Sequence, residues 1–386
     1  MSPSDHVDSY YSRTLSNATQ RPPLHERLEA QTCVIGGGLA GIATALGLAE
    51  RGQSVVLLEA NRLGWGASGR NGGFLSPGFA LGVEALEAKL GLASAQELYR
   101  LSSQAVDLVH QRASTHNIDC AALPAGIVHN SWFDDSDTVK ARIAYMNQRF
   151  STALEYWPRE RVRETYLTPR YHDAMFNPNG YQIHSLNYAN SCAVTAEQLG
   201  AIMHEQSPVR RLAKRGERHR VITADGEVTA DNVVFCCSGY IGWLNHQLSW
   251  ATLPIGTYVL LTEPLGDKLA TAIRAPYAAS DDRRIDNYYR PLPDTRLLWG
   301  GGMSISRRPA NLAKRMLEDL FGVYPQLRGI QAETAWAGTM GYARHRMPQI
   351  GRMAPGIWYN QGHGGHGLNT TTLGGELVAK AIAEDD

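Results

Sequence analysis

Charge of one sign, long apolar runs and cysteine are all scarce in this chain. Lys plus Arg equals Asp plus Glu at 37 each among 386 residues, which excludes the basic footprint of a nucleic-acid-binding protein or a polybasic membrane surface. No stretch approaches the roughly 18 uncharged apolar residues of a membrane span, and residues 1–30 lack the basic-then-apolar profile of a signal peptide. We therefore expect a cytoplasmic protein without a membrane span.

The five cysteines form no C-x-x-C pair and no grouping with histidine that resembles a metal site. Cys236 and Cys237 are neighbours in an apolar run, where successive strand side chains face opposite ways. We predict neither a disulfide nor a bound metal. The rest of the composition, 43% hydrophobic with 38 glycines and no biased tract, is typical of a globular protein large enough to bury a core, which excludes the disordered and fibrous classes.

A glycine-rich turn stands between a strand and a helix near the N-terminus. The β-branched apolar run at 32–35 leads into Gly36, Gly38 and Gly41, which open an alanine-rich helical stretch. In such a unit the first glycine permits the turn, the second lets the backbone approach a pyrophosphate, and the third lets helix and strand pack closely. A turn that serves packing alone is the alternative.

A carboxylate ends the second strand of this unit. The apolar run at 54–58 leads directly into Glu59, at the position where an acidic side chain binds a ribose 2′-hydroxyl and repels a 2′-phosphate. Strand, turn, helix and carboxylate together predict a dinucleotide site. The residues that we assign to it here are Gly36, Gly38, Leu39, Ala40, Gly41, Glu59 and Ala60.

Small residues recur soon after this unit, at 65–73, in a pattern too rich in glycine for a helix or a strand. A backbone with so few Cβ atoms can come within contact distance of a flat ligand, and Ser68 and Arg70 can hydrogen-bond a phosphate. This stretch favours a flavin over a nicotinamide as the cofactor. The alternative for the stretch is a glycine-rich surface loop without a ligand, and the alternative for Trp65 is that it fills a domain junction. We assign to the cofactor Trp65, Gly66, Ala67, Ser68, Arg70, Asn71, Gly72 and Gly73.

A third glycine run, 362–367, opens the closing helix predicted at 368–383. A helix N-terminus favours an anion, such as the negative charge that a reduced flavin carries around N1 and O2. We favour His366 over His363 as the histidine near the flavin ring; surface imidazoles are the alternative. Elsewhere the pattern predicts helices over 82–116 and 139–156 and short strands at 181–184, 221–223, 233–237, 258–262, 287–289 and 297–299.

Four motifs together resemble a known family. The βαβ unit at 33–59, the stretch 64–73, Trp-Ala-Gly at 336–338 with Pro-Gln-Ile-Gly at 348–351, and the run 362–368 occur in the order found in the D-amino-acid oxidase superfamily of FAD oxidoreductases. Within it, the chain is most similar to the gamma-glutamylputrescine oxidase branch. The resemblance extends the cofactor assignment to Val209, Ser238, Gly239, Gly338, Gly364, Gly365, His366, Gly367 and Leu368.

The resemblance implies an α/β plus α+β fold, in which a Rossmann-like FAD-binding domain is interleaved with a substrate domain built on an antiparallel sheet. The FAD-binding segments are expected at 28–80, 187–250 and 331–386, and the substrate segments at 81–186 and 251–330. It also implies the reaction. A hydride moves from the carbon that bears the amine to flavin N5, and water hydrolyses the resulting imine. O2 or another acceptor then reoxidises the flavin. No dedicated acid or base side chain is required.

Two positions differ from relatives that bind small amino acids. Glycine oxidase-like members place an arginine where this chain has Met340, and sarcosine oxidase-like members place a lysine where it has Asn369, each to pair with the substrate carboxylate. We therefore expect an amine substrate such as a polyamine or gamma-glutamyl-polyamine. The alternatives are a cyclic or N-methylated amino acid (pipecolate, sarcosine type) held by Arg290, Arg344 or Arg346, a nicotinamide dehydrogenase, and a non-catalytic flavoprotein.

Two further absences concern the flavin. No cysteine occurs at 339–348, where the sarcosine oxidase branch attaches its cofactor, so we predict noncovalent FAD. No lysine occurs at 296–303, where those enzymes place the lysine that promotes reaction with oxygen, and the electron acceptor stays open. Strand alternation directs only some of the tyrosines toward the flavin, and core tyrosines and surface histidines are the alternative. The substrate-facing candidates are His366, His345, Tyr258, Tyr288 and Tyr289.

Overall fold

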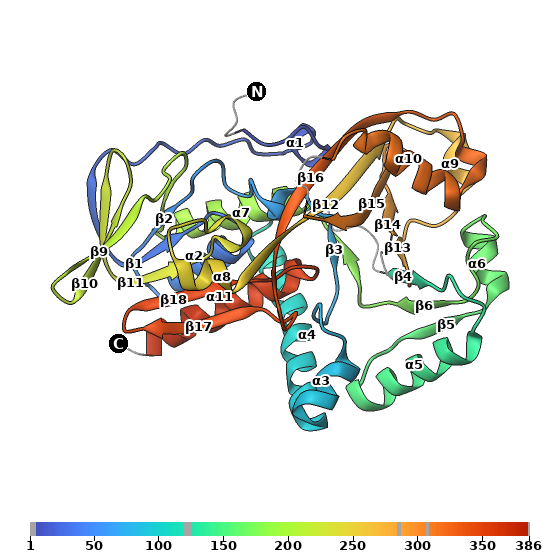
Figure 1. Cartoon of the computed structure of the whole chain (residues 1–386), viewed down its shortest axis with the longest axis horizontal. Coiled ribbons are helices and arrows are strands. Elements are labelled where there is room, and N and C mark those ends of the chain that lie inside the picture. The colour runs from blue at the N-terminus through green and yellow to red at the C-terminus, as the bar shows by residue number, and fades with distance from the viewer. Residues whose placement is uncertain (1–4, 119, 121–125, 284–286, 306–308, 385–386) are drawn as a thin grey trace.

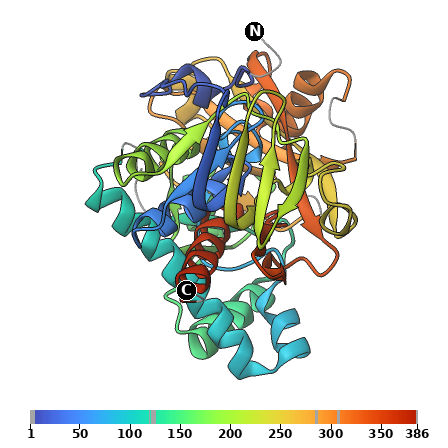
Figure 2. The same cartoon turned by 90° about the vertical axis from the view of Figure 1, so that its left-hand side faces the viewer.

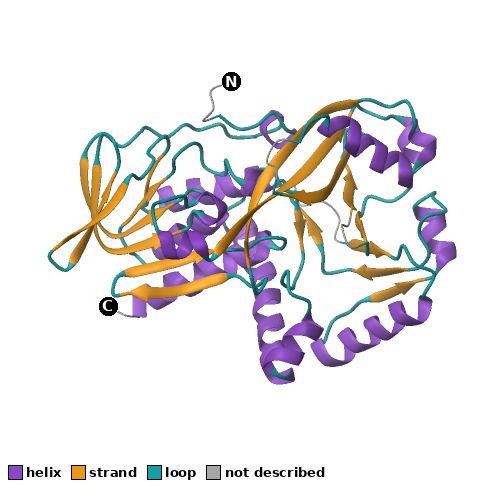
Figure 3. Ribbon diagram, in the orientation of Figure 1, coloured by secondary structure: helices purple, strands orange, loops and turns teal. Residues whose placement is uncertain are grey.

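Two eight-stranded sheets, each with its own buried core, organise the computed structural model of the chain (Figure 1). The structure describes residues 5–118, 120, 126–283, 287–305 and 309–384. The first sheet lies in the left half of the view and the second in the right half, and Figure 3 distinguishes their strands from the surrounding helices.

The first sheet is built around parallel strands. β1 (Arg27–Ile35) lies between β11 (Glu227–Phe235) and β2 (Val55–Leu58), and all three run parallel. β2 is buried along its whole length, as its continuous apolar run predicts for a strand covered on both faces. The sheet order is β17 (Gln349–Ala354), β18 (Ile357–Gln361), β11, β1, β2 and β8 (Ile202–His204), with β10 (Arg218–Ile222) and β9 (Arg211–Arg215) continuing from β11.

The helices that cover the first sheet also pack on one another. α11 (Gly367–Glu384) contacts α2 (Leu39–Ala49) and α4 (Leu92–Thr115), and α7 (Ser185–Gln198) contacts α2. A Cβ on Gly375 of α11 would lie 2.6 Å from the backbone carbonyl carbon of Ala43, so the glycine permits this close approach of α11 and α2. Figure 2 shows red α11 beside the strands of the sheet.

The second sheet is antiparallel at every described pairing except one, between β13 and β4. α10 (Leu312–Val323) packs its buried apolar residues against one face, over β12, β15 and β16. Because strand side chains alternate, the same strands present a second set of residues on the opposite face. The sheet order is β16 (Ala332–Ala343), β12 (Thr252–Thr262), β15 (Leu297–Ser304), β14 (Asn287–Pro291), β13 (Ala278–Asp281), β4 (Ile127–Asn130), β6 (Ala174–Asn177) and β5 (Glu155–Trp157).

Shorter elements complete the described part of the chain, in which no helix is long and apolar enough to cross a membrane. A two-stranded sheet pairs β3 (Phe74–Leu75) with β7 (Tyr181–Gln182). The remaining helices are α1 (Tyr10–Arg13), α3 (Val83–Leu90), α5 (Ser136–Phe150), α6 (Arg159–Thr165), α8 (His246–Trp250) and α9 (Asp267–Ala270), with single 3-10 turns η1 (Ala67–Gly69), η2 (Ser238–Tyr240) and η3 (Pro325–Leu327).

The predicted fold class is confirmed, since a Rossmann-like unit and a largely antiparallel sheet share one interleaved chain. The segment 331–386, which we assigned to FAD binding, contributes strands to both sheets, because β16 pairs with β12 of the second sheet along its length whereas β17 and β18 belong to the first. The chain therefore passes between the sheets after β16, before β17. The segment boundaries stay a prediction.

Two predicted helices differ from the expected ranges. The helix over 82–116 is divided at Gly91, whose φ of +81° ends α3 before α4 begins. The helix over 139–156 instead starts at Ser136, capped by Asp135, and ends at Phe150, because residues 155–157 form β5. The closing helix occupies almost the range expected for it, as α11.

Candidate cofactor and substrate site

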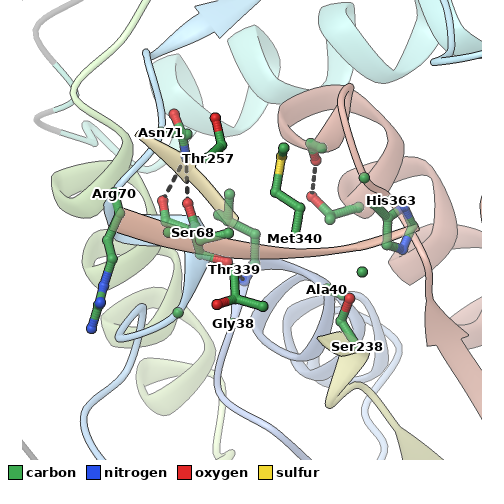
Figure 4. Close-up of a pocket in the computed structure, with 18 of the residues that line it drawn as sticks. Gly38, Ala40, Ser68, Arg70, Asn71, Ser238, Thr257, Thr339, Met340 and His363 are labelled. Atoms are coloured by element: carbon green, nitrogen blue, oxygen red, sulfur yellow. Dashed lines mark hydrogen bonds between the residues drawn. The ribbon is translucent and has the colours of Figure 1, made fainter. Parts of the chain in front are cut away.

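A cavity of about 720 Å³ is lined by both sheets (Figure 4). Its volume falls within the roughly 300–1,000 Å³ of cofactor and small-molecule sites. All three glycine-rich stretches of the sequence reach it. The assigned residues that line it are Gly36, Gly38, Leu39, Ala40, Glu59, Ala60, Trp65, Gly66, Ala67, Ser68, Arg70, Asn71, Gly72, Val209, Ser238, Gly338, Gly364, Gly365, His366, Gly367 and Leu368.

Three assigned glycines are not among the described residues that line the cavity, and their backbone explains why glycine stands there. A Cβ on Gly41 would lie 1.8 Å from the carbonyl oxygen of Gly36, so Gly41 allows α2 to pack on the turn. Gly73 has φ of +77°, and its Cβ would lie 2.4 Å from the Ile183 oxygen. Gly239 packs on Thr339. These glycines therefore support the residues that line the cavity and do not line it themselves.

The first βα turn exposes backbone to the cavity. Gly36 adopts φ of +108°, and its Cβ would lie 2.8 Å from the Cys236 oxygen, which excludes side chains there. α2 begins after Gly38, which caps it without a side-chain hydrogen bond. A Cβ on Gly38 would lie 3.0 Å from Ser68 Oγ, on the cavity side of the turn. The N-terminus of α2, with the positive end of its dipole, therefore lies beside backbone that carries no side chains. Such an arrangement binds phosphate.

Ser68 and Arg70 make contacts within the protein that the sequence did not reveal. Ser68 Oγ accepts a hydrogen bond from the Leu39 amide at 2.9 Å. Arg70 donates from Nε to the Trp65 oxygen at 2.6 Å, and its guanidinium lies 4.3 Å from the centre of the Trp65 ring. Arg70 therefore fastens the loop, and its expected bond to a phosphate stays a prediction.

The loop around Arg70 is tied to both neighbouring parts of the site. Asn71 Nδ2 donates to the oxygens of Ala67 and Ser68, as Figure 4 shows. Trp336 of β16 donates from Nε1 to the Arg70 oxygen at 2.9 Å. Trp65 itself donates to the Asp5 oxygen at 2.8 Å. The second glycine stretch is therefore an ordered wall.

Glu59 ends β2 beside the turn. Its carboxylate accepts hydrogen bonds from the amides of Gly37 at 2.6 Å and Asn61 at 2.8 Å. Burial raises the pKa of Glu59, and these two amides oppose that rise because they stabilise the charged form. Val209 lines the same cavity. A carboxylate has further lone pairs, so Glu59 can still accept a ribose hydroxyl.

The third glycine stretch is held in place by His363. Its Nε2 lies 2.9 Å from Asn360 Oδ1 and its Nδ1 lies 3.0 Å from Thr370 Oγ1, while Asn360 donates to the Ala40 oxygen of α2. Burial lowers the pKa of His363 to about 3. His366 also lines the cavity, where its Nε2 donates to the Ser76 oxygen at 3.1 Å and burial lowers its pKa.

A polar row on the second sheet forms the far wall. His129 of β4, Ser280 of β13 and Tyr288 of β14 are successive partners in the strand register, so their side chains share one face. All three line the cavity. His129 Nδ1 lies 2.7 Å from Ser280 Oγ. Burial, followed by the charges of Arg142 and His366, lowers the pKa of His129 to about 4. The row therefore carries a neutral imidazole.

Sequence reasoning missed His129 and Ser280. Each is a single polar residue in a short strand, and only the pairing of β4 with β13 brings them together. Tyr288 was a candidate, and its ring lies where Gly72 and Gly300 have no side chains: Cβ atoms there would come within 2.5 and 2.0 Å of it. The alternation of small and aromatic residues along these strands was the available signal.

Three other substrate candidates do not line the cavity. Tyr289 faces the opposite side of β14, where it stacks on Trp299 at 4.7 Å and hydrogen-bonds Tyr324 at 2.8 Å. Tyr258 is buried below Gly302. His345 is exposed, and its Nδ1 accepts from the Met347 amide. The structure therefore does not bring these three candidates to the site, since neither strand alternation nor loop position could be fixed without the register.

The three arginines considered for binding a substrate carboxylate differ in burial and in whether they line the cavity. Arg290 is buried, with Nη2 3.1 Å from the Tyr11 hydroxyl and 3.3 Å from the Ile183 oxygen. Arg344 is exposed and lies outside the described lining of the cavity, whereas Arg346 belongs to that lining. Met340 and Asn369 line the cavity, at the positions where relatives were expected to carry cations.

Among the described residues, no group of histidine, cysteine and acidic side chains could hold a metal ion. None of the five cysteines forms a disulfide. Cys236 and Cys237 line the cavity beside the first turn. Burial raises the pKa of Cys236 to about 12 and also raises that of Cys237.

Comparison with known proteins identifies the family. A family model described as FAD dependent oxidoreductase (DAO) matches residues 31–381. The chain belongs to this family. Gamma-glutamylputrescine oxidoreductase of Escherichia coli (strain K12) is 32% identical over 384 residues, which are 99% of this chain and 90% of that protein. Probable oxidoreductase OrdL of Haemophilus influenzae is 30% identical over 389 residues, 99% of this chain and 89% of that protein.

A solved structure of glycine oxidase from Bacillus cereus shares the fold, with a TM-score of 0.76 at 21% identity, covering 92% of this chain and 96% of that one. As a DAO-family member, the chain is an FAD-dependent oxidoreductase. The cavity fits FAD. Bare backbone at Gly38 suits a pyrophosphate, Glu59 suits a ribose, and the walls at 65–73 and 362–367 leave room for a flat ring system.

Proposed function

We propose that this DAO-family chain oxidises a primary or secondary amine, such as a gamma-glutamyl-polyamine, to an imine. The observation that carries the proposal is the polar row of His129, Ser280 and Tyr288, which shares one cavity with the dinucleotide turn. When bound, FAD supplies a hydride acceptor at N5, and water hydrolyses the resulting imine. The name of the Escherichia coli relative, gamma-glutamylputrescine oxidoreductase, supports an amine of this class.

The protein's part is to hold the amine with its lone pair free, because a protonated amine does not release hydride from its α-carbon. His129 supplies a neutral hydrogen-bond acceptor, since burial lowers its pKa to about 4 and keeps the imidazole uncharged at neutral pH. When Nδ1–H is donated to Ser280 Oγ, 2.7 Å away, Nε2 keeps the lone pair that accepts a hydrogen bond from the N–H of an amine that has already lost its extra proton to water. Tyr288 closes the same wall and limits the width of the site.

The flavin is held noncovalently in this proposal. The cysteines that line the cavity are Cys236 and Cys237, and burial raises both their pKa values, so neither presents the thiolate that attacks a flavin. Acid precipitation of the purified protein should leave the yellow colour in the supernatant. A yellow pellet would refute noncovalent binding.

Small α-amino acids are the second candidate substrate class, and Met340 argues against them. This thioether lines the cavity where a cation was expected to bind the carboxylate, and it cannot do so. Sarcosine and glycine should therefore be poor substrates beside putrescine derivatives. The reverse ranking would favour the cyclic or N-methylated amino acid reading.

The experiment that tests the whole proposal is an anaerobic screen of amines against the purified yellow protein, followed by admission of air. Bleaching of the flavin absorbance by an amine, with imine-derived aldehyde or ketone as product, is the expected result. Recovery of colour in air identifies O2 as an acceptor, whereas persistent bleaching indicates another one. If no amine bleaches the flavin, the non-catalytic reading replaces the proposal.

A further inference from the structure

Charged side chains are few around the cavity, and their partners differ. Among the described lining residues the acidic and basic ones are Glu59, Arg70 and Arg346. Glu59 accepts two backbone amides beside the first turn, and Arg70 donates to the Trp65 oxygen. Arg346 makes neither an ion pair nor a side-chain hydrogen bond with any residue in the described part of the chain. Its guanidinium is the charge left over for a ligand.

Arg346 stands where the chain leaves the second sheet, beside the third glycine stretch. It lies in the turn between β16 and β17, is exposed, and also lines a small hollow with Ala80, Gly364 and His366. Its amide donates to the Ala343 oxygen at 2.9 Å, and its φ of +61° is a left-handed conformation. The turn therefore holds Arg346 beside His366, which lines the main cavity as well.

The charges that line the cavity discriminate between kinds of amine. A free diamine carries an ammonium at each end, and the described residues of the polar row offer no carboxylate to receive the second one. Arg346 would repel that ammonium. An amine joined to an acidic group instead presents a carboxylate, which a guanidinium binds with two parallel hydrogen bonds.

We infer that Arg346 is a binding residue for a carboxylate carried by the amine substrate, and that it selects acid-conjugated amines over free diamines. The inference rests on the proposed amine oxidation and adds to it the residue that recognises the acidic group of the substrate. Arg346 takes no part in the chemical step, so its loss should raise KM and leave kcat nearly unchanged.

A matched set of variants and substrates tests the inference on the flavin-loaded enzyme. The variants are Arg346→Gln, Arg346→Lys, Arg346→Glu and the control Arg344→Gln, which removes an exposed arginine outside the described lining. The substrates share one diamine: it is free, N-acetylated, or N-acylated with a group that ends in a carboxylate. Anaerobic flavin bleaching at increasing amine concentration separates binding from the rate of reduction.

Arg346→Gln should raise KM for the carboxylated amine about tenfold, as expected when a charge-assisted hydrogen bond is lost, and leave the N-acetylated amine unchanged. Arg346→Lys should recover part of the loss. Arg346→Glu should lower the KM for the free diamine relative to that for the carboxylated amine. Arg344→Gln should behave as wild type. A wild-type enzyme with no preference for the carboxylated amine would overturn the inference.

A second readout separates failure of the inference from failure of the proposed function. Glutarate carries carboxylates and no amine, so it should bind the wild-type protein and perturb the flavin absorbance without bleaching it. Arg346→Gln should weaken this binding about tenfold, and Arg344→Gln should not. If amines bleach the flavin but glutarate binds both variants equally, the subsite is wrong and amine oxidation stands. If Arg346→Gln slows all three amines equally, the arginine acts on the flavin.

Discussion

The two walls of the cavity are built in different ways. The wall at the N-terminus of α2 is mainly backbone, shaped by Gly36, Gly38 and Gly41 within a few residues of sequence. The wall on the second sheet consists of side chains, His129 and Tyr288 among them, brought together from separate strands. The first wall suits a dinucleotide whatever the substrate, whereas the second is the wall that we propose to contact the amine. Cofactor retention and substrate choice should therefore be separable by mutation.

The largest effect is expected at the backbone wall. Gly38→Val places a branched side chain on the cavity side of the turn, 3.0 Å from Ser68 Oγ, where the pyrophosphate is expected. The purified variant should be colourless. Gly322→Val is the control, because a Cβ at that position in α10 would meet nothing within 4 Å. The measurement is the flavin content of each purified variant, determined by absorbance. A fully yellow Gly38→Val protein would show that the dinucleotide lies elsewhere.

At the side-chain wall the cofactor should stay and the chemistry should slow. His129→Leu removes the neutral imidazole that pairs with Ser280, and the rate of flavin reduction should fall about tenfold, as expected when one hydrogen bond that orients the amine is lost. Ser280→Ala should have a smaller effect, because the imidazole remains. Stopped-flow bleaching with a saturating amine measures the rate. A His129→Leu protein that reduces its flavin at the wild-type rate would remove His129 from the mechanism.

Neighbouring tyrosines on β14 provide a sharper form of the comparison. Tyr288 faces the cavity and Tyr289 faces the core, where its hydroxyl bonds Tyr324. Tyr288→Phe should raise the KM for the amine a few-fold and leave stability nearly unchanged. Tyr289→Phe should lower the free energy of unfolding by about 1 kcal/mol and leave KM unchanged. Steady-state kinetics and urea unfolding of both variants test this; the opposite assignment of effects would mean that β14 is turned over.

The smallest effect concerns the pH dependence of stability. Burial lowers the pKa of His363 from 6.5 to about 3, so the unfolded chain binds a proton that the folded chain refuses between those values. The stabilising contribution is fully present above pH 6.5 and is lost as the pH falls toward 3. For this group alone the free energy of unfolding should fall by about 1 kcal/mol from pH 7.5 to 5.5. Urea midpoints of wild type and His363→Gln at both pH values should show a shallower pH dependence in the variant.

Sequence reasoning succeeded where structure is local. The turn at Gly36, Gly38 and Gly41 is defined by neighbouring residues and by a βαβ order that the chain itself displays, so the spacing was enough to predict it. Gly91 and Asp135 show the limit even for local signals, since the first divides a long helical pattern and the second starts a helix before its apolar periodicity does.

The substrate wall was beyond the sequence because it depends on strand register. His129 and Ser280 are 151 positions apart, and nothing in either short strand names its partner. The same limit explains why Tyr289 and Tyr258, which lie outside the described lining, stood among the candidates beside Tyr288. The internal hydrogen bonds of Ser68 and Arg70 were also beyond the sequence, because their residue types do not reveal that the loop uses them to fasten itself, and their bonds to a phosphate stay a prediction.

Tyr288 is clasped between two positions that have no side chains, Gly72 and Gly300. The ring fills the space that a side chain at either glycine would take, so a substituent there would have to displace it. The width of the cavity beside residue 288 thus depends on one aromatic ring and two missing Cβ atoms. A descendant of this enzyme that accepts bulkier amines should arise by shortening residue 288, while both glycines persist.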